Sequence, residues 1–247
     1  MPFTLAHPAL VMPLHGSRSK LSLTGLVIGS IAPDLEFLIQ MREVENIEHQ
    51  LQGIIFFDLP AAIILAFLFH NILRNSLITH LPNFYRRRFT DLLTFDWNAY
   101  AKENKAKIVI SILIGIISHL GLDAFTHHDG WFVEMIPVLA YDIGINGHQL
   151  PIYFFLQIIL SLIGMMMVHL MILKLNIQSN DIKYPPSDYF YWLMFAVLVT
   201  VIFSIRIVCW PEWNTPEGIL IAFTGSLLYG WLPVSFLFNH YLKFKNY

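Results

Sequence analysis

The stretch PIYFFLQIILSLIGMMMVHLMIL, residues 151–173, contains no Asp, Glu, Lys or Arg. About 20 such residues in a helix are enough to cross the hydrocarbon core of a bilayer. Because lipid offers the backbone no hydrogen-bond partner, a spanning segment must be a helix or part of a closed barrel. The apolar residues are continuous rather than alternating, and this pattern indicates a helix.

Similar apolar runs recur along the chain. They predict five strong spans, at 51–73, 107–126, 151–173, 188–209 and 218–240. A sixth run, 21–39, is interrupted by Pro33, Asp34 and Glu36. We expect it to be a half-length or re-entrant helix, since irregular backbone at membrane depth must be buried in protein. The chain is 56% hydrophobic and 13% charged, whereas soluble proteins carry about 25% charged residues. We therefore predict an all-α polytopic membrane protein with five to six membrane segments and a single domain, 1–247.

The basic residues are distributed unevenly between the connections. The 74–107 connection is rich in Arg and Lys, whereas the 127–150 and 210–217 connections contain neither. By the positive-inside rule, the basic connections face the cytoplasm. We therefore expect a multi-pass protein of the cell membrane with a cytoplasmic C-terminus and an outward 127–150 loop. The mixed basic and aromatic segment 82–101 fits an interfacial helix or, almost equally well, a solvated loop.

Other features narrow the class of protein. The net charge of -2 and the lack of a basic motif argue against a nucleic-acid partner. The apolar runs make membrane lipid the partner that we expect. Cys209 is the single cysteine, which excludes an internal disulfide. The first residues lack a charged start followed by an apolar stretch, so we expect no cleaved signal peptide.

The segment SHLGLDAFTHHDGW, residues 118–131, contains a candidate metal site. Its His119, Asp123 and His127 are spaced four residues apart, which places them on one stripe of a helix. Imidazole and carboxylate ligands suit zinc, iron or manganese better than calcium. Ionisable residues in a span are costly and usually functional. The alternative is a hydrogen-bonded helix contact, and we favour the metal interpretation.

Further candidate ligands lie earlier in the chain: His7, Asp34 and His49. Together with His119 and Asp123 they could hold one or two divalent ions with an open position for water, in a site built from 1–50 and 107–130. Asp34, or less favourably Glu36, could instead act as the general base. The site requires residues 1–39 to be re-entrant or embedded, because a true span at 21–39 would separate His7 from His49.

The elements MPFTLAHPA, LVIGSIAPDLEF, HQLQG and SHLGLDAFTHHDGW, in this order, resemble a bacterial membrane family, domain of unknown function 4184. The resemblance covers most of 1–175. More distantly, the order His, Pro-Asp, His, His-x-x-x-Asp is similar to membrane-bound metal-dependent hydrolases, which in turn resemble zinc-dependent phospholipase C. The similarity implies zinc bound by the residues His7, Asp34, His49, His119 and Asp123, with Asp123 able to bridge two ions. His127 or His128 could stand for a further ligand, but the later His-x-x-x-Glu of the phospholipases is absent.

These features predict a metal-dependent hydrolase in the membrane, acting on a lipid or phosphoester substrate at the outer membrane–water interface. Two alternatives stay open. One is a membrane protein whose metal is structural, and the other is a transporter, in which buried His and Asp mark an ion path. Outside the candidate site, Arg206 is expected to snorkel to the surface or to bind a phosphate group.

Overall fold

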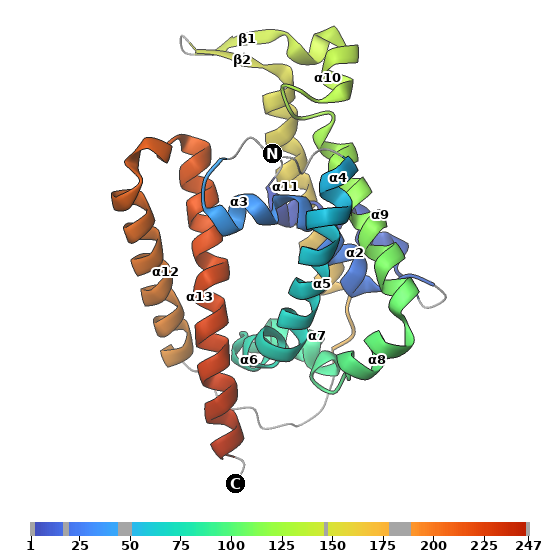
Figure 1. The fold of residues 1–247 in the computed structure, drawn as a ribbon, viewed down its shortest axis with the longest axis vertical. Coiled ribbons are helices and arrows are strands. Elements are labelled where there is room, and N and C mark those ends of the chain that lie inside the picture. The colour runs from blue at the N-terminus through green and yellow to red at the C-terminus, as the bar shows by residue number, and fades with distance from the viewer. Residues whose placement is uncertain (1–2, 17–19, 44–50, 146–147, 178–188, 246–247) are drawn as a thin grey trace. The chain divides into compact units, whose positions relative to one another are not determined.

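The computed structural model describes residues 3–16, 20–43, 51–145, 148–177 and 189–245. Over these residues the chain is almost entirely helical, with one short β-hairpin (Figure 1). Six helical segments are long and apolar enough to cross a membrane: Leu23–Gln40, Ile54–His80, Lys105–Asp123, Ile152–Leu173, Tyr189–Cys209 and Pro216–Asn239. The protein is therefore an all-α polytopic membrane protein, as the apolar runs predict.

The contacts divide the chain into two compact units. The first unit comprises Met1–Pro33, Ile47–Ile63 and Ala101–Leu173, and the second comprises Asp34–Asn46, Ile64–Tyr100 and Lys174–Tyr247. Each unit is built from segments far apart in sequence, so neither follows a simple division of the chain. The single membrane domain over 1–247 stays a prediction.

The first unit contains short helices at the beginning of the chain and two long spans. Its elements are η1 (Thr4–Ala6), α1 (Pro8–Val11), η2 (Met12–Leu14), α2 (Leu23–Gly29), α4 (Leu51–Gly53), the π-helix η5 (Ile54–Asp58), α9 (Lys105–Asp123), α10 (Trp131–Met135), η7 (Pro137–Ala140), β1 (Asp142–Ile145), β2 (His148–Pro151) and α11 (Ile152–Leu173). Strands β1 and β2 pair antiparallel, with Asp142 opposite Pro151.

Glycines bring α2 and α9 into direct backbone contact. A Cβ atom at Gly29 would overlap the carbonyl oxygen of Ile112, and one at Gly115 would lie 2.5 Å from the carbonyl oxygen of Leu26. Small residues allow helices in a membrane to approach this closely, and packing then replaces the hydrophobic effect as the source of stability. The crossing therefore fixes the end of α2 against the middle of α9.

The run predicted to be half-length is indeed broken. Helix α2 ends at Gly29, the 3-10 turn η3 (Ala32–Asp34) follows, and α3 (Leu35–Gln40) begins a new helix. The break coincides with Pro33 and Asp34, because proline cannot donate the backbone hydrogen bond that a continuous helix requires.

The second unit contains α3, the later part of α5 (Leu59–Leu68), the π-helix η6 (Phe69–Leu73), α6 (Arg74–His80), α7 (Asn83–Leu93), the first part of α8 (Trp97–Glu103), α12 (Tyr189–Cys209), η8 (Pro211–Trp213) and α13 (Pro216–Lys245). Helices α12 and α13 pack along each other around buried Tyr191, Val234 and Phe238. The segment 82–101 is helical, in α7 and α8, rather than a solvated loop.

The expectation that Arg206 snorkels to the surface is wrong. Its side chain is 4% exposed, and its Nε donates to the carbonyl oxygen of Met41 at 2.7 Å. Its Nη atoms donate to the side chain of Asn214 at 2.7 Å and to the carbonyl oxygen of Trp213 at 3.1 Å. Met41 ends α3 in the left-handed conformation, with φ 53°. The guanidinium therefore binds backbone and side-chain oxygens of the second unit.

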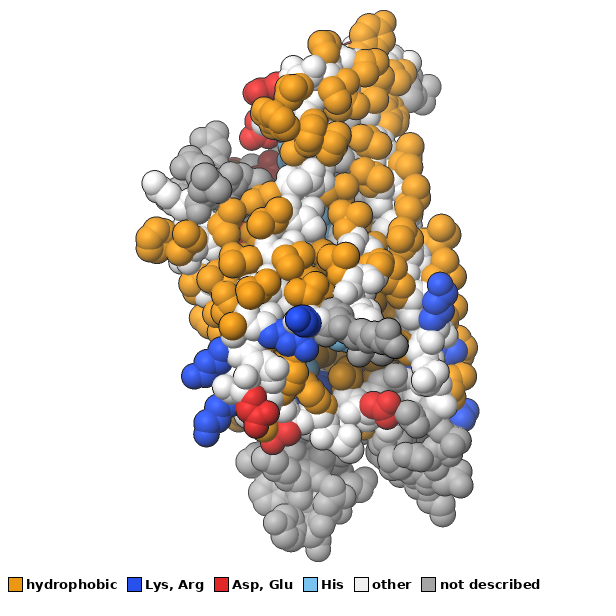
Figure 2. Space-filling model, turned by 90° about the vertical axis from the view of Figure 1, so that its right-hand side faces the viewer, with side chains coloured by type: hydrophobic (Ala, Val, Ile, Leu, Met, Phe, Trp, Pro, Cys, Tyr) orange, Lys and Arg blue, Asp and Glu red, His pale blue; other side chains and the backbone are white. Residues whose placement is uncertain are grey.

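Large hydrophobic side chains are exposed along the spans. Leu162 of α11 is 68% exposed and Phe190 of α12 is 58% exposed. Figure 2 shows hydrophobic side chains over much of one face of the molecule. In water such extensive apolar surface is rare on a stable protein, whereas in a bilayer it faces lipid.

Candidate metal centre

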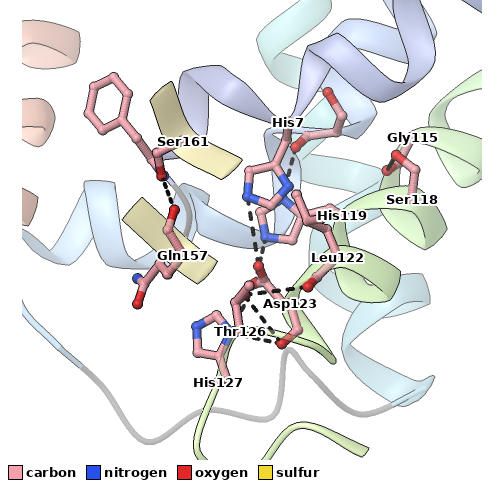
Figure 3. Close-up of polar contacts among 12 residues, drawn as sticks. His7, Gly115, Ser118, His119, Leu122, Asp123, Thr126, His127, Gln157 and Ser161 are labelled. Atoms are coloured by element: carbon pink, nitrogen blue, oxygen red, sulfur yellow. Dashed lines mark hydrogen bonds and ion pairs between the residues drawn. The ribbon is translucent and has the colours of Figure 1, made fainter. Parts of the chain in front are cut away.

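Three polar side chains of the first unit meet in its interior. His7 lies between η1 and α1, while His119 and Asp123 lie one turn apart at the end of α9 (Figure 3). The side chains of His7 and His119 are 0% exposed and that of Asp123 is 3% exposed. One potential ligand atom from each residue lies within 4.8 Å of the others. We call this group the His–His–Asp cluster.

The Asp123 carboxylate faces both imidazoles with different oxygens. Its Oδ2 lies 3.1 Å from His119 Nε2, and its Oδ1 lies 3.7 Å from His7 Nε2. The two imidazole rings stack with centroids 3.7 Å apart and planes inclined by 14°. Two rings and one carboxylate thus surround a small volume with three potential donor atoms.

A backbone carbonyl orients His119. Its Nδ1 lies 2.8 Å from the carbonyl oxygen of Ser30, which can only accept a hydrogen bond, so Nδ1 carries the proton. In the neutral ring the other nitrogen, Nε2, then has a lone pair directed toward Asp123. Nε2 and Asp123 Oδ2 lie 3.1 Å apart, and a metal ion or a shared proton would stabilise this close approach.

The position of His7 depends on α11. The amide of Phe3 donates to Ser161 Oγ at 2.8 Å, and Ser161 Oγ itself donates to the carbonyl oxygen of Gln157. A Cβ atom on Gly164 would lie 2.8 Å from Cβ of Ala6, so the glycine allows η1 to lie against the helix. Pro8 then starts α1 directly after His7. This short segment therefore carries His7 to α9.

The donor set fits a divalent metal ion. Ligand atoms about 2 Å from one tetrahedral zinc ion lie about 3.3 Å from each other. The two separations between Asp123 and the imidazoles, 3.1 and 3.7 Å, are close to that value and involve different carboxylate oxygens, and one ligand atom from each of the three residues lies within 4.8 Å of the others. The hydrogen bond from His119 Nδ1 to a carbonyl group is the arrangement that metal-bound histidines usually show. The residues thus fit the ion that their chemistry suggests.

The model of one protein family, domain of unknown function (DUF4184), matches residues 1–232. The chain belongs to this family. No curated protein and no solved structure matches it. The DUF4184 match includes the His–His–Asp cluster and both helices, α9 and α11, that position it.

Among the other predicted ligands of this DUF4184 protein, His127 lies next to the cluster. His127 does not continue the helical stripe, because α9 ends at Asp123. Its Nδ1 donates to the backbone carbonyl of Asp123 at 3.1 Å and lies 3.8 Å from Asp123 Oδ2. With 23% of its side chain exposed, His127 forms the accessible edge of the cluster. His128 is 80% exposed beside Asp129.

Asp34 and Glu36 belong to the second unit. Asp34 is fully buried at the beginning of α3, and Glu36 on that helix accepts a hydrogen bond from Gln40. His49 lies outside the described residues. Sequence reasoning missed Ser30, because it acts through its backbone carbonyl. The only signal in the sequence is the pair Gly29 and Gly115, whose lack of side chains lets that carbonyl reach His119.

Proposed function

We propose that this protein is a membrane-embedded metal-dependent hydrolase that acts on a lipid or phosphoester substrate at the outer membrane–water interface. In this proposal His7, His119 and Asp123 hold one divalent ion, with zinc the best match to two imidazoles and a carboxylate. The supporting observation is the buried His–His–Asp cluster, in which the hydrogen bond to Ser30 turns His119 Nε2 toward Asp123.

Among the residues that the structure describes, three potential ligands converge at the cluster, and a site with three protein ligands favours catalysis over a purely structural metal. Structural zinc sites usually have four protein ligands, whereas catalytic sites have three and leave one position for water. A bound ion would lower the pKa of that water and stabilise charge on a phosphoryl oxygen. The chain supplies a negative charge from Asp123, fixes the proton of His119 on Nδ1 through Ser30 so that Nε2 can bind the ion, and excludes bulk water by burial.

The position of the cluster along α9 favours a substrate from the membrane surface. Asp123 is the last residue of α9, at the opposite end from Lys105. His119 lies one turn, about 6 Å, closer to the middle of the helix. With the basic connections in the cytoplasm, this end of the helix faces outward. His127, on the exposed edge of the cluster, marks the side from which water and substrate would approach.

The first test is metal content. The full-length protein, purified in detergent and loaded with zinc, is compared with the variants His7→Ala, His119→Ala and Asp123→Asn by elemental analysis. Each variant should lose most of the bound ion, whereas His128→Ala, which alters an exposed neighbouring histidine, should retain it. If no metal binds under any loading condition, the proposal fails, and a buried proton-sharing network in a transporter becomes the better explanation.

The second test is activity. The loaded protein is assayed with soluble phosphodiesters and with phospholipids, with and without a chelator. We expect chelator-sensitive hydrolysis that disappears in the variants that lose metal and persists in His128→Ala. Full metal occupancy together with no chelator-sensitive turnover on any of these substrates would favour the structural-metal alternative.

A further inference from the structure

The connection between α9 and α11 exposes several large apolar side chains, together with the acidic side chains of Glu134 and Asp142. Four of its side chains, Trp131, Met135, Val138 and Tyr141, are between 59% and 67% exposed. The whole connection, 127–150, contains no Lys or Arg. A loop that stands in water normally exposes polar residues, and a contiguous apolar surface usually marks a contact. We call residues 131–145, which include α10, η7 and β1, the apolar lobe.

The apolar lobe is fixed to the ends of both spans. At its beginning the amide of Phe132 donates to the carbonyl oxygen of Ala124 at 3.1 Å, just beyond the end of α9. Phe132 also stacks on Phe125, with centroids 3.9 Å apart. At its other end Tyr141 accepts a hydrogen bond of 3.0 Å from Ile152, the first residue of α11.

These contacts determine how far the lobe lies from the bilayer. If α9 and α11 cross the bilayer over their full apolar lengths, the end of α9 and the beginning of α11 lie near the membrane boundary, and η7 packs against α11. The interfacial layer on each side of the hydrocarbon core is about 5–8 Å thick. A segment hydrogen-bonded to the ends of two spans lies within or next to this layer.

We propose that the apolar lobe inserts into the adjacent leaflet and binds its lipids through apolar and aromatic contacts. Trp131 and Tyr141 are of the residue types that concentrate at membrane interfaces. Figure 2 shows hydrophobic side chains over the end of the molecule where Figure 1 places α10 and the hairpin. With no basic residue in 127–150, the contact does not depend on anionic headgroups.

We favour lipid over a second copy of the chain as the occupant, because the same unit also exposes an apolar stripe on its candidate spanning helix α11. Ile158, Leu162 and Met166 follow one stripe of α11, four residues apart, and all three are exposed. This apolar stripe and the lobe belong to the same unit. The inference is independent of the metal, since it would hold for a protein with any function at the cluster.

The test measures the depth of the lobe in vesicles. Cys209, the single cysteine, is replaced in the variant Cys209→Ser, and a nitroxide label is attached to Val138→Cys or, separately, to Met135→Cys. The control label is at Asp129→Cys, because the Asp129 side chain is 71% exposed. In phosphatidylcholine vesicles the accessibility of each label to oxygen and to a water-soluble nickel complex is measured by electron paramagnetic resonance.

We expect the labels at Val138 and Met135 to be accessible to oxygen and protected from nickel at least tenfold relative to Asp129. The protection should not change with salt concentration, because no basic side chain takes part. Equal nickel accessibility at all three positions would place the lobe in water and overturn the proposal. The surface would belong to an interface with a second copy if protection from nickel decreased as the protein is diluted with lipid. In that case the spectra should also show spin–spin broadening at high protein density.

Discussion

The variant Gly115→Ala tests whether the α2–α9 crossing positions the cluster. The added Cβ would lie 2.5 Å from the carbonyl oxygen of Leu26, 2.6 Å from the amide nitrogen of Ser30 and 2.7 Å from the carbonyl carbon of Gly29. All three are backbone atoms, so no side chain can rotate away. Restoring ordinary contact at 3.4 Å requires the helices to separate by about 0.9 Å.

That separation would break the hydrogen bond that orients His119. Ser30 follows α2 directly, and its carbonyl oxygen lies 2.8 Å from His119 Nδ1. An added 0.9 Å would lengthen the distance to about 3.7 Å, beyond the range of a hydrogen bond. Loss of such an orienting partner typically lowers metal affinity about 10–100-fold. The overpacking itself should lower the free energy of unfolding by about 1–3 kcal/mol.

The assay is zinc titration against a competing chelator, together with thermal unfolding of the same sample. The control is Gly121→Ala on the same helix, where an added Cβ meets nothing within 4 Å. This control should bind zinc normally and gain up to about 1 kcal/mol from helix propensity. If Gly115→Ala remains folded at the titration temperature and binds zinc as tightly as Gly121→Ala, the crossing does not position His119.

Two further predictions concern other parts of the chain. Arg206→Met should lower the unfolding temperature by several degrees, because buried carbonyl groups lose their hydrogen-bond donors. Arg206→Lys should also unfold at a lower temperature than the unaltered protein, since a single ammonium group cannot replace the several donors of the guanidinium group. Unchanged unfolding temperatures in calorimetry would show that these bonds contribute little. In a cysteine-free background, a cysteine at Asp129, which lies in the 127–150 connection but outside the apolar lobe, should react with an impermeant reagent added outside intact cells, whereas one near Arg87 should react only after lysis. The opposite labelling pattern would reverse the assigned orientation.

The spans were predictable because uncharged runs of this length have few alternative structures. The run predicted at 151–173 forms α11 over Ile152–Leu173, and the run predicted at 107–126 forms α9 over Lys105–Asp123. The run predicted at 51–73 continues to His80. The polar residues of α6 lower the hydropathy of this segment, so the apolar run ends before the helix does. Hydropathy reports side-chain composition and not backbone hydrogen bonding.

The cluster was only partly predictable. A spacing of four places His119 and Asp123 on one face of any helix, so this pair follows from the sequence. His127 follows the same spacing, but the helix ends before it, and its ring bonds to a backbone carbonyl instead. The contact of His7 with α9 depends on Gly164 and Ser161 of α11. Such packing between distant segments leaves no periodic pattern in the sequence.

The separation of His7 from α9 and α11 along the chain also affects how the protein is made. Ala6 packs closely against Gly164. Because ribosomes add roughly 5–20 residues per second, Gly164 is synthesised roughly 10–30 s after His7. During that interval the early segments enter the bilayer before the cluster can close. In the proposed metal site, capture of the ion would therefore be a late step of biogenesis, and metal-starved cells should accumulate an inserted but unmetallated form of the chain.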